Sequence, residues 1–361
     1  MSILNEPAVQ MINYEDIILK RLKNFPEHEE DFIRSITGAI EKDYDEISIA
    51  FAKSLLKIDK KGFDEFGFFT LGKDIWIIFD KSSECLLGYE VITRKRGGCI
   101  KLGPTYIKPY ARGKRYAVKA IDGLSNVYKN MGARKIYVTA PLSHNATAVL
   151  DFQYLALNLE AILYNHYSTK SSERISGRFI GQHEDRINIS PRVKYGSNKL
   201  HSVLVNCLGD NSIEDFTEFV VQNMHRDYDD IDNNFVNSIL KGVDRGIDSA
   251  YEKKGKLLVS AFSEASLEGV AIITLKRGGV MKVIPFLLKD DYVSYENVKR
   301  ILSVIENCAE KYNRRKITFF ISARDVNITN ILSSNQYMCE GVIREPYKKG
   351  IDMVILSKFL T

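Results

Sequence analysis

Four consecutive residues combine the side chains and the backbone freedom that a phosphate-binding loop needs. Arg112, Lys114 and Arg115 carry positive charge, and Gly113 between them lets the backbone turn tightly without a side chain in the way. An apolar stripe at helical spacing follows directly, over residues 117–128. A tight loop at the start of a helix offers converging backbone N–H donors and the positive end of the helix dipole, which together suit pyrophosphate. The basic side chains add charge-assisted hydrogen bonds, so we expect a phosphorylated ligand here.

Two segments of the chain repeat each other at a fixed shift. Residues 88–98 read GYEVITRKRGG and residues 269–279 read GVAIITLKRGG, a shift of 181 positions from 88 to 269. The shift persists without a gap for dozens of residues, and one inserted residue then takes Asn145 to Asn327. A period this long is typical of a duplicated domain rather than of a solenoid repeat.

The repeat and the composition between its copies predict the domain boundaries. The chain has 361 residues, of which 45% are apolar, enough for two domains that each bury a core. A polar stretch without periodicity separates the copies. We therefore expect an N-terminal domain at 1–180, a linker at 181–200 and a C-terminal domain at 201–361.

Hydrophobic periodicity predicts a mixed α/β order in each copy. Helices are expected in the first copy over 14–24, 28–58, 117–128 and 146–157, the last capped by Ser143 or Asn145. Strands are expected there over 75–79, 86–93, 100–107, 136–140, 162–167 and 177–180. The second copy repeats the order, with helices over 215–223, 234–248 and 297–312 and strands over 257–262, 270–275, 282–287 and 317–321. The fold class is thus α/β (α+β), each domain a mixed, mostly antiparallel sheet flanked by helices.

The segment around the basic loop resembles a motif of the GNAT acetyltransferases. In that family a Val/Ile-x-Pro after the fourth strand leads into [Arg/Gln]-x-x-Gly-x-[Gly/Ala] and a helix, and residues 107–117 read IKPYARGKRYA. Arg115 stands where the family usually has its second glycine. We expect Gly113 to take over the tight turn and Arg115 to point outward.

The next segment, residues 132–167, extends the resemblance. It is similar to the family's fifth strand, Asn-x-x-Ala helix, Tyr-x-x-x-Gly-Phe turn and Glu-Ala-x-Leu strand, with Ala156-Leu157 in place of Gly-Phe. The resemblance implies two GNAT-like domains, acetyl-CoA as co-substrate and no metal. It also implies that the pantetheine arm pairs with the strand edge at 102–107. The residues implied to bind the cofactor are Leu102, Tyr106, Ile107, Arg112, Gly113, Lys114, Arg115, Tyr116, Ala117, Asn145, Ala148 and Phe152.

Acetyl transfer to an amine needs a base for the amine and a proton for the leaving thiolate. In the family the proton often comes from a tyrosine seven residues after the helix asparagine, but that position is Phe152. Tyr154 is the substitute, against the alternative of an ordinary amphipathic tyrosine. Glu90 is the nearest acid for the base, acting through water, against the alternative of an outward-facing strand residue. His144 and His166 are interpreted as structural, and proximity and orientation carry much of the chemistry.

The second copy lacks the basic loop. At the same shift, the positions of residues 112–115 hold Val293, Ser294, Tyr295 and Glu296, without a glycine or a basic residue, and Glu296 would repel phosphate. Asn327 persists, but the tyrosine position is Ser334. We expect this copy to be a degenerate partner that completes the substrate cleft, shapes specificity or stabilises the first copy.

The bulk composition narrows the environment and the partners. A net charge of +5 is mildly basic and lacks the dense basic stripe of a nucleic-acid binder. Five scattered cysteines form no zinc spacing, and the N-terminal residues have no charge-free apolar core. No apolar run approaches the roughly 20 residues of a membrane span. We expect a cytoplasmic monomer or homodimer that binds no membrane and no nucleic acid.

Three functions are compatible with these residues. The first is acetyl transfer from acetyl-CoA to a primary amine of a small molecule, by direct attack in a ternary complex in the N-terminal domain. The second is a transferase of the Fem type that uses aminoacyl-tRNA, which predicts no CoA loop and a more basic surface. The third is a non-catalytic acyl-CoA-binding or regulatory protein, suggested by Phe152 and the ill-defined base.

Overall fold

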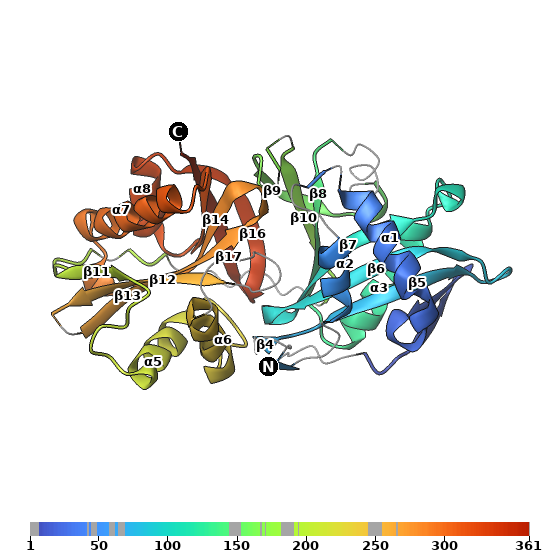
Figure 1. The fold of residues 1–361 in the computed structure, drawn as a ribbon, viewed down its shortest axis with the longest axis horizontal. Helices are drawn as coiled ribbons and strands as arrows, with labels where there is room; N and C mark the ends of the chain where they lie inside the picture. The colour runs from blue at the N-terminus through green and yellow to red at the C-terminus, as the bar shows by residue number, and fades with distance from the viewer. Residues whose placement is uncertain are drawn as a thin grey trace. The chain divides into compact units, whose positions relative to one another are not determined.

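The protein was analysed in a computed structural model, which describes residues 7–41, 43–44, 49–57, 62–63, 69–143, 153–166, 168–169, 171–181, 191–193, 195–244, 255–264 and 266–360. The chain divides into two compact units (Figure 1). Unit 1 comprises Met1–Asp64, Phe69–Glu160 and Ser168–Asp185, and unit 2 comprises Glu65–Phe68, Ala161–Tyr167 and Arg186–Thr361. Residues 161–166 are grouped with unit 2, where Lys316 and Glu340 hydrogen bond the backbone of Tyr164.

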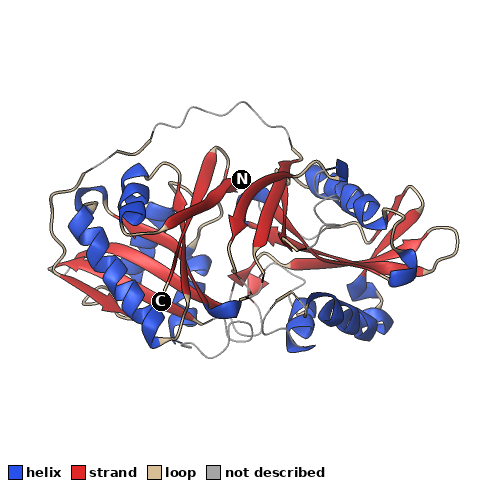
Figure 2. Cartoon of the chain, turned by 90° about the horizontal axis from the view of Figure 1, so that it is seen from above, coloured by secondary structure: helices blue, strands red, loops and turns tan. Residues whose placement is uncertain are grey.

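Unit 1 has helices on both faces of a sheet (Figure 2). Its main strands are β1 (Met11–Tyr14), β2 (Ile17–Arg21), β5 (Lys73–Asp80), β6 (Leu86–Lys95), β7 (Cys99–Ile107), β8 (Lys135–Pro141) and β10 (Glu173–Phe179). A separate pair is formed by β3 (Gly62–Phe63) and β4 (Phe69–Thr70). The helices are α1 (Glu29–Ile40), α2 (Ile49–Leu56) and α3 (Tyr116–Asn130), with short 3₁₀ turns η1 (Leu22–Asn24), η2 (Pro26–His28), η3 (Arg96–Gly98) and η4 (Pro109–Ala111).

The unit 1 sheet runs in the order β1-β2-β5-β6-β7-β8-β10. All its neighbours are antiparallel except β7 and β8, which are parallel. Along β5, Ile75 and Ile77 pack with α1 and α2 on one face, while Trp76 and Ile78 pack with α3 on the other. This period-2 alternation of large apolar side chains buries both faces of the central strands.

Unit 2 also has two helices, then three antiparallel strands, a helix and a strand, in that order. Strand β9 (Asn158–Leu163) contributes its last three residues, and the other strands are β11 (Ser202–Val205), β12 (Lys256–Ser263), β13 (Ser266–Lys276), β14 (Val280–Leu288), β15 (Lys316–Ser322), β16 (Met338–Lys348) and β17 (Ile351–Phe359). The helices are α5 (Ile213–Met224), α6 (Asn233–Asp244), α7 (Tyr295–Lys311) and α8 (Val326–Ser334), with turns η6 (Arg277–Gly279) and η7 (Asp290–Tyr292). The sheet order is β16-β17-β15-β14-β13-β12-β11, and only β14 and β15 are parallel. Figure 1 shows α5 and α6 on one face of this sheet and α7 and α8 on the other.

Positions related by the 181-residue shift share their backbone conformation. Gly97 and Gly278, in the turns between the hairpin strands, have φ angles of 66° and 65°. The parallel pairing begins at Cys99 opposite Lys135 in unit 1 and at Val280 opposite Lys316 in unit 2, and it lasts four residues in each.

A buried ion pair recurs in the two units as well. Lys135 Nζ lies 2.7 Å from Glu160 in unit 1, and Lys316 Nζ lies 2.6 Å from Glu340 in unit 2. All four side chains are 3% exposed or less. Because a buried charge is costly without a partner, each lysine and glutamate fixes the position of the other.

The expected fold class, a mixed α/β fold with a mostly antiparallel sheet and helices, is confirmed. The helix expected over 14–24 is wrong, because this region forms the β1–β2 hairpin. Ile17 and Leu19 are buried while Ile18 and Lys20 between them are partly exposed, which is the alternation of a strand. The expected helix at 28–58 is two helices, α1 and α2.

Candidate functional site

The basic loop joins the end of β7 to the start of α3. After η4, Arg112 to Arg115 cross to the helix, which begins at Tyr116. Gly113 has a φ of +82°, is exposed, and has no atom within 4 Å of where a Cβ would stand. Arg115, the residue before the helix, also has a left-handed conformation, with φ 60° and ψ 20°. Gly113 and Arg115 thus both take the backbone conformation that glycine adopts most easily, which makes the loop tight.

The first turn of α3 is open to an anion. No side chain caps it, and its first turn contains no acidic residue. The first N–H groups of a helix have no partner inside the helix, and they carry the positive end of its dipole. Helix α7 of unit 2 differs, since the Ser294 hydroxyl accepts a hydrogen bond from the Asn297 N–H and Glu296 lies in the first turn.

The basic side chains of the loop have distinct positions. Arg112 donates from Nε to the carbonyl of Ile107 at 3.1 Å and lies over the ring of Tyr106 at 6.0 Å, so it is tied back to β7. The Arg115 guanidinium lies 4.3 Å from the ring centre of Tyr154. Lys114 is exposed. The loop therefore presents positive charge beside an uncapped helix start.

Tyr116 and Ala117 form the start of α3, where they present backbone N–H groups. The Tyr116 side chain is buried against the core, and its hydroxyl donates to Asp80 at 3.4 Å. Ala117 is partly buried in the first turn. Their N–H groups stand at the helix start.

Strand β7 has an open edge beside this loop. Its parallel pairing with β8 ends at Leu102 opposite Val138, while its pairing with β6 continues to Ile107. Beyond Leu102, no ladder with β8 uses the edge in the described part of the chain. Leu102 is buried in the core, and Tyr106 and Ile107 are partly buried. Such an edge offers backbone donors and acceptors to an extended ligand.

Glu90 lies behind that edge and is completely buried. One oxygen, Oε1, accepts a hydrogen bond from the Gly103 N–H at 3.1 Å, at the point where a bulge interrupts the β6–β7 register. The other, Oε2, has no hydrogen-bond partner among the described residues. Burial raises the pKa of Glu90 to about 8, against hydrogen bonds from Thr105 and Gly103 that lower it. The alternative of an outward-facing strand residue is wrong, and a carboxyl with this pKa exchanges protons near neutral pH.

Tyr154 is 36% exposed and stacks on Arg115, so its ring braces the end of the basic loop. Asn145, Ala148 and Phe152 lie outside the described residues, as does His144. His166 belongs to unit 2, where burial and then nearby lysines hold its pKa well below the usual range.

A cluster that the sequence did not single out ties α1 to the end of β7. Lys108 Nζ lies 2.6 Å from Asp31 Oδ1, and the Tyr89 hydroxyl donates to Asp31 Oδ2 at 2.7 Å. Burial opposes ionisation of Asp31, but the hydrogen bonds from Lys108 and Tyr89 prevail and lower its pKa. The sequence pointed to this cluster only through Lys108, which recurs as Lys289 at the shift of 181. In the structure Lys289 Nζ lies 2.8 Å from Glu268 Oε2.

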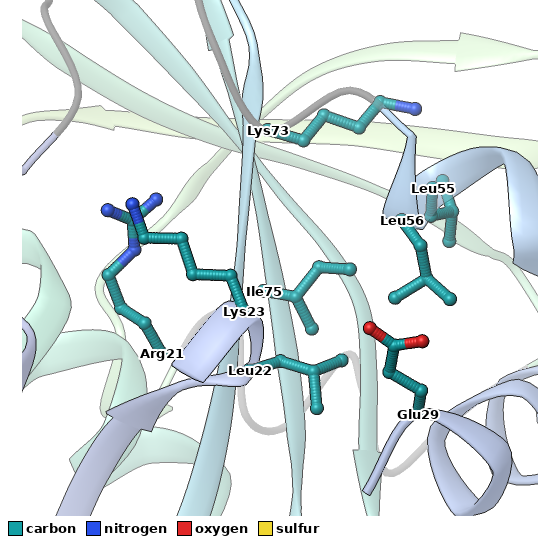
Figure 3. Close-up of a pocket in the computed structure, with 8 residues that line it drawn as sticks. All are labelled: Arg21, Leu22, Lys23, Glu29, Leu55, Leu56, Lys73 and Ile75. Carbon is teal, nitrogen blue, oxygen red and sulfur yellow. The ribbon is translucent and has the colours of Figure 1, made fainter. Parts of the chain in front are cut away.

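A small pocket of about 50 Å³ lies elsewhere in unit 1 (Figure 3). Figure 3 shows the side chains of Arg21 and Lys23 on one side of Ile75, with Leu56 and Glu29 on the other. None of the predicted site residues lines it. We therefore assign it no part in the candidate site.

The corresponding region of unit 2 is built differently. Only Val293 and Ser294 lie between η7 and α7, whereas Arg112 to Arg115 lie between η4 and α3. Helix α7 therefore begins at a position that belongs to the loop in unit 1. Ala271 stands at the position of Glu90 and is buried. Unit 2 therefore has neither the basic loop nor the buried carboxyl.

The described residues contain neither a metal-binding cluster nor a membrane-spanning helix. Three or more His, Cys, Asp or Glu side chains are nowhere grouped in them so as to hold a metal ion. No helix within the described ranges has the length and apolar character needed to cross a membrane.

Comparisons with known proteins gave structural likenesses alone. No protein-family model matches the chain, and no curated protein matches it. Part of the chain is similar to a probable GNAT-family acetyltransferase from Chromobacterium violaceum, with 16% identity over 49% of this chain and 89% of that one and a TM-score of 0.38. It is also similar to an acetyltransferase from Salmonella typhimurium that modifies the N-terminal serine of ribosomal protein L7/L12, with 10% identity, 47% and 98% coverage and a TM-score of 0.38. An aminoglycoside 6'-N-acetyltransferase complexed with coenzyme A has 11% identity, 46% and 99% coverage and a TM-score of 0.35.

Proposed function

We propose that unit 1 is an acyl-CoA-dependent N-acyltransferase of the GNAT type, which transfers acetyl from acetyl-CoA to a primary amine of a small molecule in a ternary complex. The observation that carries the proposal is the uncapped start of α3, directly after the Arg112–Arg115 loop. It stands at one end of the open β7 edge, and the buried carboxyl of Glu90 lies behind that edge. A phosphate site at the start of α3, an extended backbone edge on β7 and a proton acceptor on the neighbouring strand β6 thus come together in unit 1.

The residues present fit the chemistry of acetyl-CoA. Its pyrophosphate needs N–H donors and positive charge, which the first turn of α3, Lys114 and Arg115 offer. Its pantetheine arm carries amide groups that pair with a free strand edge, and residues 103–107 supply one. When bound, acetyl-CoA supplies a thioester carbonyl that an amine can attack.

Two side chains are assigned to proton transfer. Glu90 accepts a proton from the ammonium form of the acceptor through water, which leaves a neutral amine to attack. The new bond joins the amine nitrogen to the carbonyl carbon, and the carbon–sulfur bond breaks. Tyr154 is proposed to give its proton to the departing thiolate sulfur, and the nitrogen passes its remaining extra proton to the resulting tyrosinate, giving CoA and the amide.

We also propose that the two units are copies of one fold and that unit 2 is the degenerate copy. Support comes from the shared turn, the shared parallel register and the recurring buried pairs Lys135–Glu160 and Lys316–Glu340. The turn, the parallel register and the two lysines recur at a shift of 181 positions, and the glutamates recur at 180, which supports a common template. Residues 181–200 then connect the copies.

Calorimetric titration of acetyl-CoA tests the proposal, with wild type beside the Arg112→Ala/Gly113→Asp double variant. Wild type should bind one equivalent, and the double variant should lose binding by roughly 100-fold or more because an acid in the loop repels phosphate. A screen of small amines then follows the release of CoA. Binding without turnover of any amine would favour the acyl-CoA-binding function, and absence of binding would overturn the proposal.

A further inference from the structure

A short segment after the boundary between the units lies over one end of unit 2. We call residues 191–193 and 195–200 the strap, and all their contacts described here are within unit 2. The strap has no regular secondary structure apart from one parallel bridge, between Arg192 and Asp325. It is nevertheless held at three points along its length.

The first point is the side chain of Arg192, which enters a pocket of carboxylates. Its Nε lies 2.8 Å from Asp325 Oδ1, and its Nη2 contacts both Asp227 Oδ2 and Asp325 Oδ2. The guanidinium is 12% exposed, and Asp227 also accepts a hydrogen bond from the Ser322 hydroxyl at 3.1 Å. A guanidinium held by two carboxylates at this depth is a specific contact, because its planar fork matches their geometry.

The second point is a backbone crossing at Gly196. Its N–H donates to the Val293 carbonyl at 2.9 Å, and the Asn198 N–H donates to the Asp291 carbonyl at 3.2 Å. A Cβ at Gly196 would stand 2.0 Å from the Asp291 carbonyl oxygen. The strap therefore approaches this turn so closely that only glycine fits there.

The third point is Asn297, which is 5% exposed in the first turn of α7. Its Oδ1 accepts from the Leu200 N–H at 3.1 Å, and its Nδ2 donates to the Asn198 carbonyl at 2.8 Å. Arg300 donates to the Leu200 carbonyl at 2.6 Å, and the Leu200 side chain is buried in the core. The Asn297 side chain thus binds one backbone N–H and one backbone carbonyl of the strap, the same two kinds of group that pair between neighbouring strands.

The place of these contacts in the fold is informative. At the shift of 181, Asp291 and Val293 correspond to Tyr110 and Arg112, and Asn297 corresponds to Tyr116 at the start of α3. The strap therefore crosses the unit 2 counterpart of the basic loop and of the uncapped helix start. Asp325, at the other end of the strap, precedes α8 directly after β15.

We propose that unit 2 has a peptide-binding groove, that its ligand is an extended arginine-bearing peptide, and that the strap is this ligand, bound within the same chain. The inference rests on the proposed function in one respect only, namely that it treats this groove as the counterpart of the proposed acetyl-CoA site in unit 1. The charged residues of this groove suit a cationic ligand rather than a phosphate. Carboxylates at Asp227 and Asp325 suit a guanidinium, and Glu296 at the helix start disfavours phosphate.

Amide hydrogen exchange of the full chain tests the strap without any ligand. The N–H groups of Gly196, Asn198 and Leu200 should exchange roughly 100-fold or more slowly than in an unstructured peptide, because releasing the strap breaks several hydrogen bonds at once. Exchange at the rate of a free peptide would overturn the proposal. Since acetyl-CoA takes no part, this result is independent of the proposed function.

Variants of the strap test which contacts hold it. Arg192→Ala should lower the unfolding midpoint of unit 2 by roughly 5–15 °C, because it leaves the buried Asp227 and the partly buried Asp325 without this cation. Tyr195→Ala is the matched control, since Tyr195 is on the same segment but 82% exposed, and it should leave the midpoint unchanged. Equal effects of the two variants, or none from Arg192→Ala, would overturn the proposal. If Arg192→Ala does not fold, the wild-type exchange rates decide.

Discussion

The environment of Glu90 sets the pH at which it can act as a base. The carboxyl is fully buried beside the bulge of β7, and burial raises its pKa to about 8. Only one of its oxygens accepts a backbone hydrogen bond, from Gly103. A group with a pKa of about 8 is protonated at neutral pH in most of the molecules, and only its ionised form accepts a proton from an amine.

Glu90→Gln should abolish the pH dependence of acetyl transfer on this group. In wild type we expect kcat/KM to rise with pH and to level off above about 8, since the ionised form then predominates. The variant should be slower by roughly 100-fold or more and should lack that rise. Initial rates measured across neutral and alkaline pH check this. A profile with the same midpoint in both proteins would exclude Glu90 as the base.

Stability provides a control that does not depend on turnover. The folded-state pKa of Glu90 is raised from 4.5 to about 8, so the folded state holds a proton that the unfolded state releases in this window. The free energy of unfolding should therefore fall as pH rises from about 4.5 to 8, and it should fall less in Glu90→Gln. Equal slopes in the two proteins would mean that Glu90 is not buried in solution.

Tyr154 has two proposed parts, a ring that braces Arg115 and a hydroxyl that protonates the thiolate. Tyr154→Phe keeps the ring over the guanidinium, so acetyl-CoA should bind as in wild type while kcat falls by roughly 10- to 100-fold. Tyr154→Ala removes both and should weaken binding too. Steady-state kinetics and calorimetry separate the two effects. An unchanged kcat in Tyr154→Phe would leave the tyrosine with the bracing part alone.

At the scale of elements, the sequence predicted the loop and the strands better than the ends of the helices. The repeat of RKRGG and LKRGG located both hairpins, because a double glycine at positive φ is required by their turns. The stretch from Ile17 to Arg21 was predicted as a helix, yet it is a strand buried on one face. Its side chains are all apolar or long, so the sequence fits the helical period and the strand period equally well. The burial of Glu90 depends on a bulge between two strands, which no local pattern shows.

Gly88 tests how tightly β6 and β7 are joined behind the site. A Cβ there would stand 2.1 Å from the Tyr106 carbonyl oxygen, which is backbone and cannot move aside easily. Gly88→Ala should destabilise unit 1 by about 2–3 kcal/mol in denaturant unfolding. Gly38→Ala is the matched control, because Gly38 lies in α1 with no atom within 4 Å of its Cβ position, and it should be neutral or stabilising by about 0.5–1 kcal/mol. Destabilisation by both variants alike would contradict this reading of Gly88.

At the scale of the whole molecule, each unit has its own buried core, although the proposed donor site is in unit 1 only. Among the described residues, the core around α3 contains 19 buried apolar residues and the core around α7 contains 25. The sequence predicts that unit 2 lacks the basic loop, because residues 293–296 include no glycine and no basic residue. In the structure the connection between η7 and α7 is also shorter than the connection between η4 and α3. The strap could not have been predicted, because its glycine, asparagine and arginine are brought together with α7 and α8 only by the fold.

A ligand that binds unit 1 alone should stabilise unit 1 alone. The single tryptophan, Trp76, is buried in unit 1, so its fluorescence reports the unfolding of that unit, while circular dichroism reports both. At about 100 times its Kd, acetyl-CoA should raise the stability seen by Trp76 by about 2.7 kcal/mol and leave a second dichroism transition in place. Gly113→Asp should remove the shift, and it should lower the transition of the free protein only slightly, because Gly113 is exposed but its φ of +82° strains any other residue. A shift of both transitions would mean that unit 2 also binds the donor, and the strap would then have to leave its groove.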